Sequence, residues 1–244
     1  MRVLISLVMV VLMASFAFAK VPITDTVDMD FNMRPRLIVD NRDFNADTGW
    51  ADDGDLRTMI GISVSPNEDL FVRIRLRESR GLGDQGTLAG PTAEFEAQEA
   101  YAKLKDVFGR PMTFTVGRFE YEHGRGRIVG ATGWSTFGPR NYDGIHIGFK
   151  PSFGHIGFAV LRADEKGPVD YNIVIVDGCF LDGAFKPLFV AELDNEDYGA
   201  EDLNRRYTMG FFYHRGIGES LSIVMDAAYQ MGAMMDIDVA SYMI

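Results

Sequence analysis

Arginine is the residue type in this sequence with the clearest ability to bind a ligand, because it recurs at every second position of apolar stretches. The chain contains 18 arginines against 6 lysines. In residues 70–77 apolar residues alternate with three arginines, which are Arg73, Arg75 and Arg77. Arginine stays charged, and its planar guanidinium matches the shape of a carboxylate or a phosphate. Such a row predicts a surface that attracts anionic groups.

Ten residues on polar faces form the predicted pore-lining or substrate-binding set. They are Arg34, Arg36, Arg57, Arg73, Arg75, Arg77, Arg118, Glu120, Arg127 and Arg140. A row of arginines inside a barrel would make a pore that attracts anions. Acids accompany the arginines, Glu78, Glu99 and Glu122 among them. The alternative is therefore a set of salt bridges that stabilises the wall. Both roles can coexist, because acids on neighbouring strands can hold the arginines in position.

The arginines belong to a chain-long alternation of apolar and polar residues with period two, which indicates β-strands. About twelve such stretches follow one another, each roughly 8–12 residues long, the length that a tilted membrane strand needs. They are residues 30–39, 56–65, 70–77, 95–106, 112–122, 143–150, 153–162, 171–177, 184–193, 205–215, 219–230 and 235–243. The connections alternate between long and short, and this alternation weakens in the second half. The sequence thus predicts an all-β protein, a transmembrane antiparallel β-barrel of the outer-membrane type.

Three stretches need separate treatment. Residues 93–107 are rich in Ala, Glu and Lys, so propensity alone favours a helix about as much as a strand. Near Gly117 the alternation changes phase: Val116 shares a face with Arg118 unless a β-bulge intervenes, and glycine suits a bulge. The long segment 123–141 is rich in glycine and carries several arginines. We expect it to fold inward and constrict the pore.

Composition excludes several classes of protein. The chain has 244 residues, a net charge of −11 and one cysteine, Cys179. A single cysteine excludes a disulfide framework within one chain and a cysteine-based zinc site. The acidic balance argues against nucleic acid as a partner. A hydrophobic content of 47% argues against disorder.

The N-terminus predicts export. Residues 1–19 begin with a basic Arg2, continue with an apolar run and end in Ala17-Phe18-Ala19, which is the form of a secretory signal peptide with its cleavage site. The alternative is a transmembrane anchor. No later apolar run is long enough for a spanning helix. We therefore expect cleavage after residue 19 and a mature barrel domain of residues 20–244.

Nothing in the sequence indicates an enzyme or a cofactor. The four histidines are scattered with no pair at i, i+4 spacing: His123, His146, His155 and His214. Glu120 and Glu122 are paired carboxylates, but such a pair in a strand pattern need not be catalytic. Four aspartates crowd the segment 41–55, namely Asp47, Asp52, Asp53 and Asp55. Calcium could bind them, and a solvated loop without a metal is the alternative that we favour.

Residues 116–149 carry a series of short motifs. They are Val116-Gly117-Arg118 with Glu120, then Gly124, then Arg127 with Val129-Gly130, then Trp134-Ser135, and finally Arg140 with Tyr142-Asp143-Gly144. These motifs resemble the signature stretch of the alginate export family of outer-membrane porins. Looser matches lie at residues 34–36, 56–58, 99–105, 206–208 and 227–230, so the resemblance covers most of residues 30–244. It implies a large antiparallel barrel, an arginine-lined electropositive pore and passage of an anionic uronate polysaccharide. It also implies that residues 95–106 form a strand.

The chain departs from that family in its strand count. The predicted strands number about twelve, whereas the family's barrel has roughly 18. Both numbers are within the range known for outer-membrane barrels. The end, Ser241 to Ile244, is in mid-strand pattern without the usual terminal aromatic residue. We therefore expect an incomplete barrel, truncated at its C-terminus, and a closed twelve-stranded barrel is the alternative.

The expected function is transport rather than catalysis. We predict a porin or exporter in the outer membrane of a Gram-negative bacterium, in contact with outer-membrane lipid, that passes an anionic polysaccharide or small anionic solutes and needs no cofactor. One alternative is a general small-solute porin on the same barrel. An alternative of another class is a soluble periplasmic β-rich binding protein, which would bury its apolar strand faces in a core.

Overall fold

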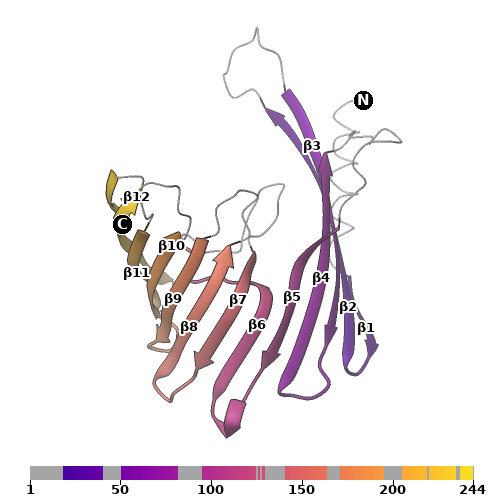
Figure 1. Ribbon diagram of the computed structural model, residues 1–244, viewed down its shortest axis with the longest axis horizontal. Helices are drawn as coiled ribbons and strands as arrows, with labels where there is room; N and C mark the ends of the chain where they lie inside the picture. The colour runs from indigo at the N-terminus through magenta and orange to yellow at the C-terminus, as the bar shows by residue number, and fades with distance from the viewer. Residues whose placement is uncertain are drawn as a thin grey trace. The chain divides into compact units, whose positions relative to one another are not determined.

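The computed structural model describes residues 19–40, 51–81, 95–124, 126, 128–129, 141–163, 171–194, 205–218, 220–234 and 237–243. Within these residues the fold is all-β, with thirteen strands and one turn of 3-10 helix, η1 (Val107–Gly109) (Figure 1). The strands are β1 (Ala19–Thr24), β2 (Val27–Asp40), β3 (Ala51–Val64), β4 (Leu70–Gly81), β5 (Glu96–Leu104), β6 (Met112–Glu120), β7 (Asn141–Phe149), β8 (Gly154–Ala163), β9 (Tyr171–Phe180), β10 (Phe185–Asp194), β11 (Arg205–Ile217), β12 (Leu221–Met234) and β13 (Ile237–Met243). No helix in these ranges has the length and apolar character to cross a membrane.

The strands follow one another in the sheet in sequence order, with β1 and β13 at the two ends. Antiparallel registers join β1 to β2, β2 to β3, and every neighbouring pair from β6 to β13. A meander in which each strand neighbours the next is the topology of outer-membrane barrels. The predicted fold class is confirmed: the chain forms an all-β antiparallel sheet consistent with part of such a barrel.

All twelve predicted strand segments are strands, and β1 is one more than predicted. β1 pairs with β2 from Ala19↔Phe31 to Thr24↔Val27. Its alternation is short and follows directly on the predicted cleavage site, so the sequence pattern did not reveal it. Except for Ala19, the predicted signal peptide lies outside the described residues, and the division at residues 19 and 20 stays a prediction.

One expectation about a segment boundary is corrected. β3 begins at Ala51, so residues 51–55, expected at the end of a long loop, belong to a strand. The long–short alternation of connections weakens in the second half, as predicted. After β8 the strands leave seven residues before β9, four before β10, ten before β11 and three before β12, but only two, residues 235 and 236, between β12 and β13.

Residues 96–104 form strand β5, as the family resemblance implied, although helix propensity alone left the question open. Propensity is a weak preference that tertiary context overrides. In the sheet order β5 lies between β4 and β6, where its backbone groups find partners. The ring centroid of Tyr101 lies 6.2 Å from that of Phe119 on β6.

The chain divides into two compact units. Unit 1 comprises Met1–Pro66, Arg73–Ala100 and Gly133–Gly138, and unit 2 comprises Asn67–Val72, Tyr101–Thr132 and Pro139–Ile244. Strands β1 to β3 and most of β4 and β5 therefore belong to unit 1, and β6 to β13 belong to unit 2.

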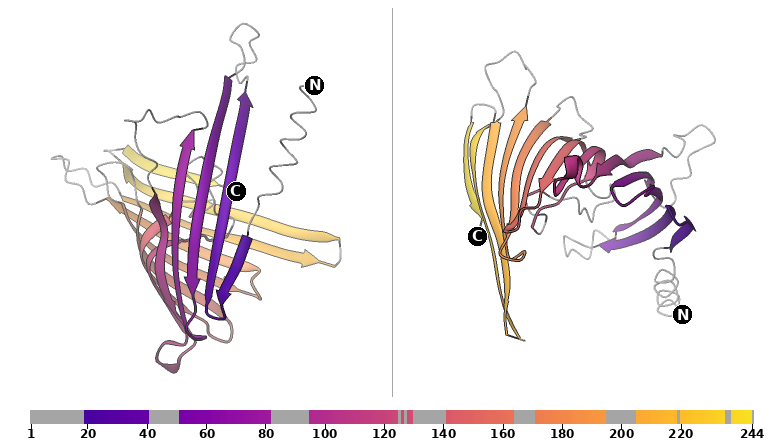
Figure 2. Two further views of the ribbon diagram at one scale, coloured as in Figure 1. Left: turned by 90° about the vertical axis from the view of Figure 1, so that its right-hand side faces the viewer. Right: turned by 90° about the horizontal axis from the view of Figure 1, so that it is seen from below.

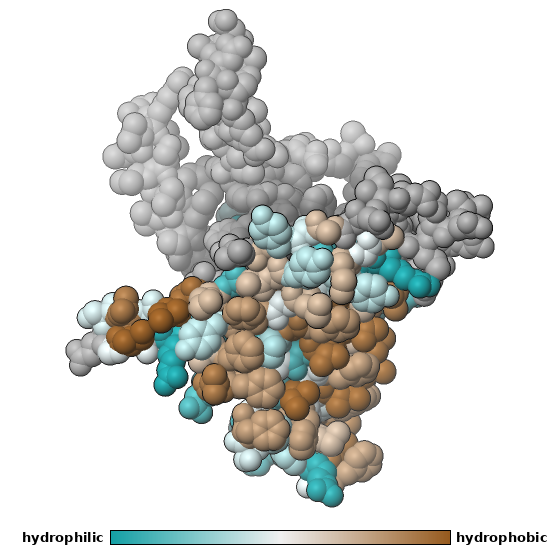
Figure 3. Space-filling view, turned by 90° about the vertical axis from the view of Figure 1, so that its left-hand side faces the viewer, coloured by the Kyte–Doolittle hydropathy of each residue, from teal (hydrophilic) through white to brown (hydrophobic). Residues whose placement is uncertain are grey.

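The strands of unit 2 form a curved sheet (Figure 2). One face of this sheet is buried and the other is exposed. The buried face, called the inner face of unit 2, carries a core cluster that includes Phe119, Leu161, Ile175 and Val190. The opposite face, called the outer face of unit 2, exposes large apolar side chains such as Val116, Ile145, Phe158, Val176 and Met209. Figure 3 shows brown, hydrophobic side chains gathered over one side of the described residues.

Unit 1 also separates its residues by strand face, with the polar residues on the more buried side. Ser63 and Glu99 are buried, and the side chains of Arg73 and Asp30 are only 14% and 21% exposed. This side is called the polar face of unit 1. The opposite side exposes Ile60, Ile62, Ile74 and Leu76. Exposed aliphatic residues opposite a charged face are the pattern of a membrane strand, whose apolar side meets lipid.

Candidate functional site

Arg73 and Arg75 lie side by side on β4 and share two carboxylates. Arg73 donates from Nε to Oε2 of Glu99 at 2.8 Å, and its Nη2 lies 2.9 Å from Oδ2 of Asp30. Arg75 contacts the same acids, with Nη2 3.1 Å from Oδ1 of Asp30 and Nη1 3.0 Å from Oε2 of Glu99. The Nη1 of Arg73 donates to Oγ of Ser63 at 2.6 Å. Asp30, Arg73, Arg75 and Glu99 thus form one group, called the charge cluster.

The charge cluster is balanced and largely shielded from water. It contains two positive and two negative groups, and the exposed fractions of its side chains range from 7% for Glu99 to 21% for Arg75 and Asp30. Charge-assisted hydrogen bonds of this kind fix the position of an arginine. This geometry is that of salt bridges, the alternative role considered for the arginines in the sequence. The same contacts hold the guanidinium groups in place on the polar face.

Asp30 reaches the arginines because a glycine lies beneath it. Asp30 on β2 is the register partner of Gly61 on β3. A Cβ added to Gly61 would lie 2.5 Å from Oδ2 of Asp30. The bare backbone at this position lets the Asp30 side chain extend over β3 to Arg73 and Arg75 on β4.

The other arginines of unit 1 follow the same face. Arg34 and Arg57 are register partners on β2 and β3, and Arg34 is in phase with Asp30. Arg77 pairs with Glu96, with Nη2 2.7 Å from Oε2. Arg36 lies in β2 opposite Asp55, but its side chain is outside the described part. Five predicted arginines, Arg34, Arg57, Arg73, Arg75 and Arg77, therefore share the polar face of unit 1.

Arg118 and Glu120 lie on the outer face of unit 2, in phase with the exposed Val116. The β6–β7 register runs without a shift through Gly117↔Gly144, so no bulge between these two strands turns Arg118 to the other side. Arg118 makes a double contact with Asp143, with Nε–Oδ1 and Nη2–Oδ2 distances of 2.8 and 2.6 Å. Arg118 therefore lies against a cross-strand carboxylate on the outer face of unit 2.

Arg127 and Arg140 lie outside the described residues, but neighbours of Arg127 are described. Val129 is 5% exposed and belongs to the core cluster of the inner face. Its carbonyl accepts a hydrogen bond from the backbone N–H of His123 at 3.1 Å. Nε2 of His123 lies 3.1 Å from the carbonyl oxygen of Lys186 on β10. The described start of the segment between β6 and β7 therefore lies against the inner face of unit 2.

A second polar group, which the sequence pattern did not reveal, is centred on Asp177 of β9. The hydroxyl of Tyr121 donates to Oδ1 of Asp177 at 2.6 Å. Nδ1 of His123 lies 3.7 Å from Oδ2, and Nε2 of His146 lies 4.0 Å from Oδ1. Burial raises the pKa of the Tyr121 phenol most, and the nearby Asp177 carboxylate raises it further. The phenol therefore stays protonated and donates its hydrogen bond. The ring centroids of His146 and His155 are 6.4 Å apart.

This group could have been suspected from phase alone. On their strands, His146, His155 and Asp177 point to the same face as the apolar residues that are buried on the inner face. A polar side chain at such a position needs partners, because burial without hydrogen bonds is costly. The partners themselves depend on registers across several strands, which the spacing of the histidines does not contain.

A comparison of the sequence with models of known protein families identifies the family of this chain. The sequence model of the alginate export family matches residues 26–163, which is more than half of the chain. The chain belongs to the alginate export family. This is a family of outer-membrane porins, whose members transport rather than catalyse, and its name describes polysaccharide export. No curated protein matches the chain.

The part of the chain matched to the alginate export family runs from β2 to the end of β8. It contains the charge cluster and the motif-rich stretch 116–149. Of that stretch, Arg118 and Asp143 are bonded to each other, and Val129 and Tyr142 both lie in the core cluster. The motif residues that the structure describes thus link β6 to β7 and fix the start of the segment between them.

The calcium hypothesis is not decided. Asp47 lies outside the described residues, and Asp52, Asp53 and Asp55 lie in β3 with side chains that are not described. Among the described side chains, no group of three or more His, Cys, Asp or Glu residues has the arrangement to hold a metal ion.

Proposed function

We propose that this member of the alginate export family contributes the wall of an outer-membrane pore for an anionic polysaccharide of the uronate type, or for related anionic solutes. The observation that carries the proposal is the polar face of unit 1. Five of the predicted arginines share that face, while the aliphatic residues between them are exposed on the other side. On a membrane strand the apolar side faces lipid, so the arginines would face the pore.

Passage through such a pore requires no chemical step. A carboxylate of the substrate would replace Asp30 or Glu99 as the acceptor of hydrogen bonds from Arg73 and Arg75. Because the charge cluster is balanced, each such site would hold an anion weakly. Several weak sites allow both entry and exit, which conduction requires. From sequence we add Arg36, Arg127 and Arg140 to the proposed set, whereas the position of Arg118 and Glu120 favours a structural role at the end of β6.

A general small-solute porin is the second candidate, and the balanced charge cluster favours it. Two arginines whose charges are cancelled by neighbouring acids attract anions less strongly than free arginines. The two candidates share the fold and differ in whether a polymer binds along the wall.

Polymer length separates these candidates. Uronate oligomers of increasing length are added to single channels of the purified full-length protein in a planar bilayer, and the frequency and duration of block are recorded. A polysaccharide pore predicts residence times that increase with oligomer length, because a longer chain engages several weak sites at once. Block that is independent of length, or no block at any length, would favour the general porin. The Arg73→Gln and Arg75→Gln variants should shorten the residence times.

A further inference from the structure

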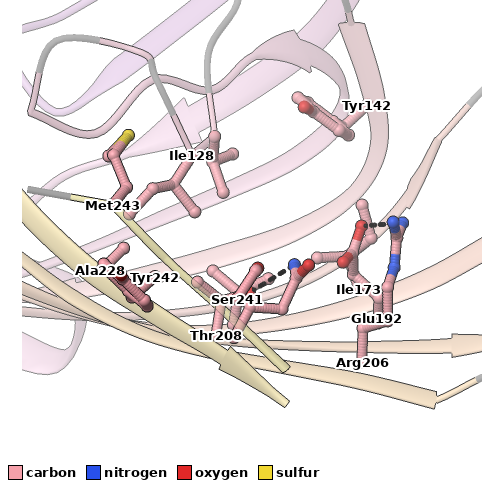
Figure 4. Close-up of a pocket in the computed structure, with 13 residues that line it drawn as sticks. Ile128, Tyr142, Ile173, Glu192, Arg206, Thr208, Ala228, Ser241, Tyr242 and Met243 are labelled. Carbon is pink, nitrogen blue, oxygen red and sulfur yellow. Dashed lines mark hydrogen bonds and ion pairs between the residues drawn. The ribbon is translucent and has the colours of Figure 1, made fainter. Parts of the chain in front are cut away.

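A cavity of about 290 Å³ lies on the inner face of unit 2, over its last four strands (Figure 4). Side chains of β10 to β13 form one side of it. Ile173 on β9 lies beside Glu192 as its register partner. Tyr142 on β7 and two residues of the segment between β6 and β7, Ile128 and Val129, complete the lining. The cavity belongs to neither the charge cluster nor the Asp177 group.

The polar side of the cavity is a series of cross-strand pairs. Glu192 and Arg206 are register partners on β10 and β11, with Oε1 and Nη2 2.9 Å apart. Thr208 and Gln230 are register partners on β11 and β12, and Nε2 of Gln230 donates to Oγ1 of Thr208 at 3.0 Å. Ser241 on β13 lies opposite Gln230. The row therefore offers a guanidinium, a carboxylate, an amide and two hydroxyls.

The apolar part of the lining is buried. Val129, Tyr142, Ile173 and Val190 are between 3% and 6% exposed and belong to one core cluster. Ile128 packs against that cluster and against Gly210, where an added Cβ would lie 2.8 Å from its Cδ1. The cavity is thus lined by a buried apolar surface as well as by the row of polar groups.

The charges of the cavity do not favour an anion. Arg206 has Glu192 as its one partner within the described residues. A carboxylate ligand attracted by the guanidinium would also be repelled by Glu192, whose Oε1 lies 2.9 Å from Nη2 of Arg206. Groups that both donate and accept hydrogen bonds suit the mixed donors and acceptors better, and hydroxyls are such groups. A pyranose ring has hydroxyls around its edge and a C–H face that packs on apolar side chains.

We propose that this cavity is a subsite for one pyranose unit of a glycan, recognised through its hydroxyl groups rather than through a carboxylate. The volume is near the lower end of the range of small-molecule pockets, about 300 Å³, which suits one sugar ring better than a long segment. The proposal rests on the proposed function in taking a glycan as the ligand. It goes beyond it because the recognised feature is uncharged and lies on a different unit from the charge cluster.

A matched pair of sugars tests this subsite. Methyl β-D-glucopyranoside and methyl β-D-glucuronide share the ring and differ by one carboxylate. Saturation-transfer NMR on the full-length protein in detergent micelles measures the binding of each, with micelles alone as the blank. We expect saturable binding of both sugars with dissociation constants within about threefold, because the shared hydroxyls carry the contact.

Variants of the polar row provide the second arm. The combined Thr208→Val and Gln230→Leu variant should weaken binding of both sugars about tenfold, the effect of losing one or two hydrogen bonds. Thr113→Val, on β6 and outside the cavity, is the matched control and should bind like the wild type. Far-UV circular dichroism checks that each variant is folded. If the double variant does not fold, the single variant Thr208→Val takes its place.

Three results would overturn the subsite: no saturable binding of either sugar, at least tenfold tighter binding of the glucuronide, or equal binding by the wild type and the Thr208 and Gln230 variants. Ion selectivity of the same preparations separates the two proposals. Anion selectivity without sugar binding would overturn the subsite alone, whereas sugar binding with cation selectivity would overturn the anionic pore alone.

Discussion

Two carboxylates of this protein each extend across a glycine to partners beyond the neighbouring strand. Asp30 passes over Gly61 and reaches Arg73 and Arg75, and Asp177 lies opposite Gly157 on β8 and reaches Tyr121 and His146. A Cβ on either glycine would collide with the carboxylate. The absence of a side chain at these positions thus decides which charges can meet on the polar and inner faces.

The first prediction concerns Gly61→Ala. The new methyl group should push the Asp30 carboxylate away from Arg73 and Arg75. The two largely buried arginines would then lose a charged hydrogen-bond partner, which should destabilise the protein by about 1–3 kcal/mol. Urea unfolding of the protein in lipid vesicles measures the change. Gly216→Ala is the control, because an added Cβ there meets nothing within 4 Å. Equal unfolding midpoints for the two variants would contradict the proposed role of Gly61.

The second prediction concerns the balance of the charge cluster. Asp30→Asn removes one negative charge and leaves both arginines, so the cluster changes from neutral to a net charge of +1. The permeability ratio of anions to cations should increase, and more so at low salt, where charges are screened less. Reversal potentials of single channels measure this ratio. Asp182→Asn, in the exposed turn before β10, should leave it unchanged, and a decrease for Asp30→Asn would refute the predicted direction.

At the residue scale the sequence predicted faces but not partners. Alternation alone placed Arg73, Arg75 and Arg77 on the side opposite Ile74 and Leu76, and the structure agrees. It did not reveal that Arg73 and Arg75 share the same two acids, or that Asp177 gathers Tyr121 and two histidines. Those contacts bridge strands that are not adjacent, and they depend on glycines whose effect is seen only once the register is known.

At the scale of elements, strand existence was predictable and strand ends were less so. Period-two alternation found β2 to β4 and β6 to β13, because each of these strands has one apolar face. β1 is short, has Pro22 within it and offers little alternation. β5 has a composition that suits helices, and only the family resemblance identified it as a strand. Segment ends such as Ala51 depend on pairing with the neighbouring strand, here Asp40↔Ala51, rather than on local composition.

The third prediction concerns the segment between β6 and β7. Its described residues lie against the inner face through Val129 and His123, so the segment should narrow the pore. Deletion of residues 124–133 should raise the single-channel conductance. Val129→Asp should act in the same direction, because an unpaired carboxylate is costly in the buried position that Val129 occupies. Conductance equal to that of the wild type in both variants would show that the segment does not constrict the pore.

At the scale of the whole molecule, both units expose aliphatic and aromatic side chains on one side of their strands. A water-soluble β-protein would place these residues in a core, since large exposed apolar patches mark sites that meet lipid or other proteins. The arrangement therefore agrees with membership of a family of outer-membrane porins and argues against the soluble alternative.

The fourth prediction follows from that outer surface. The full-length protein should remain with the membrane fraction after a periplasmic wash and should need detergent for extraction. Immunoblots of the wash, of the membrane fraction and of its detergent extract measure the distribution, with a soluble periplasmic protein as the marker. Recovery of most of the protein in the detergent-free wash would instead support the soluble binding protein.

The reversal potential of the purified full-length protein in a planar bilayer under a potassium chloride gradient tests the anionic pore most directly. Five arginines on the polar face predict an anion-selective sign, made modest by the acids that balance Arg73 and Arg75. The triple variant Arg73→Gln, Arg75→Gln and Arg77→Gln should lose this selectivity. A cation-selective sign for the wild type would mean that the acids dominate the pore, and it would contradict the proposed passage of anionic polysaccharide.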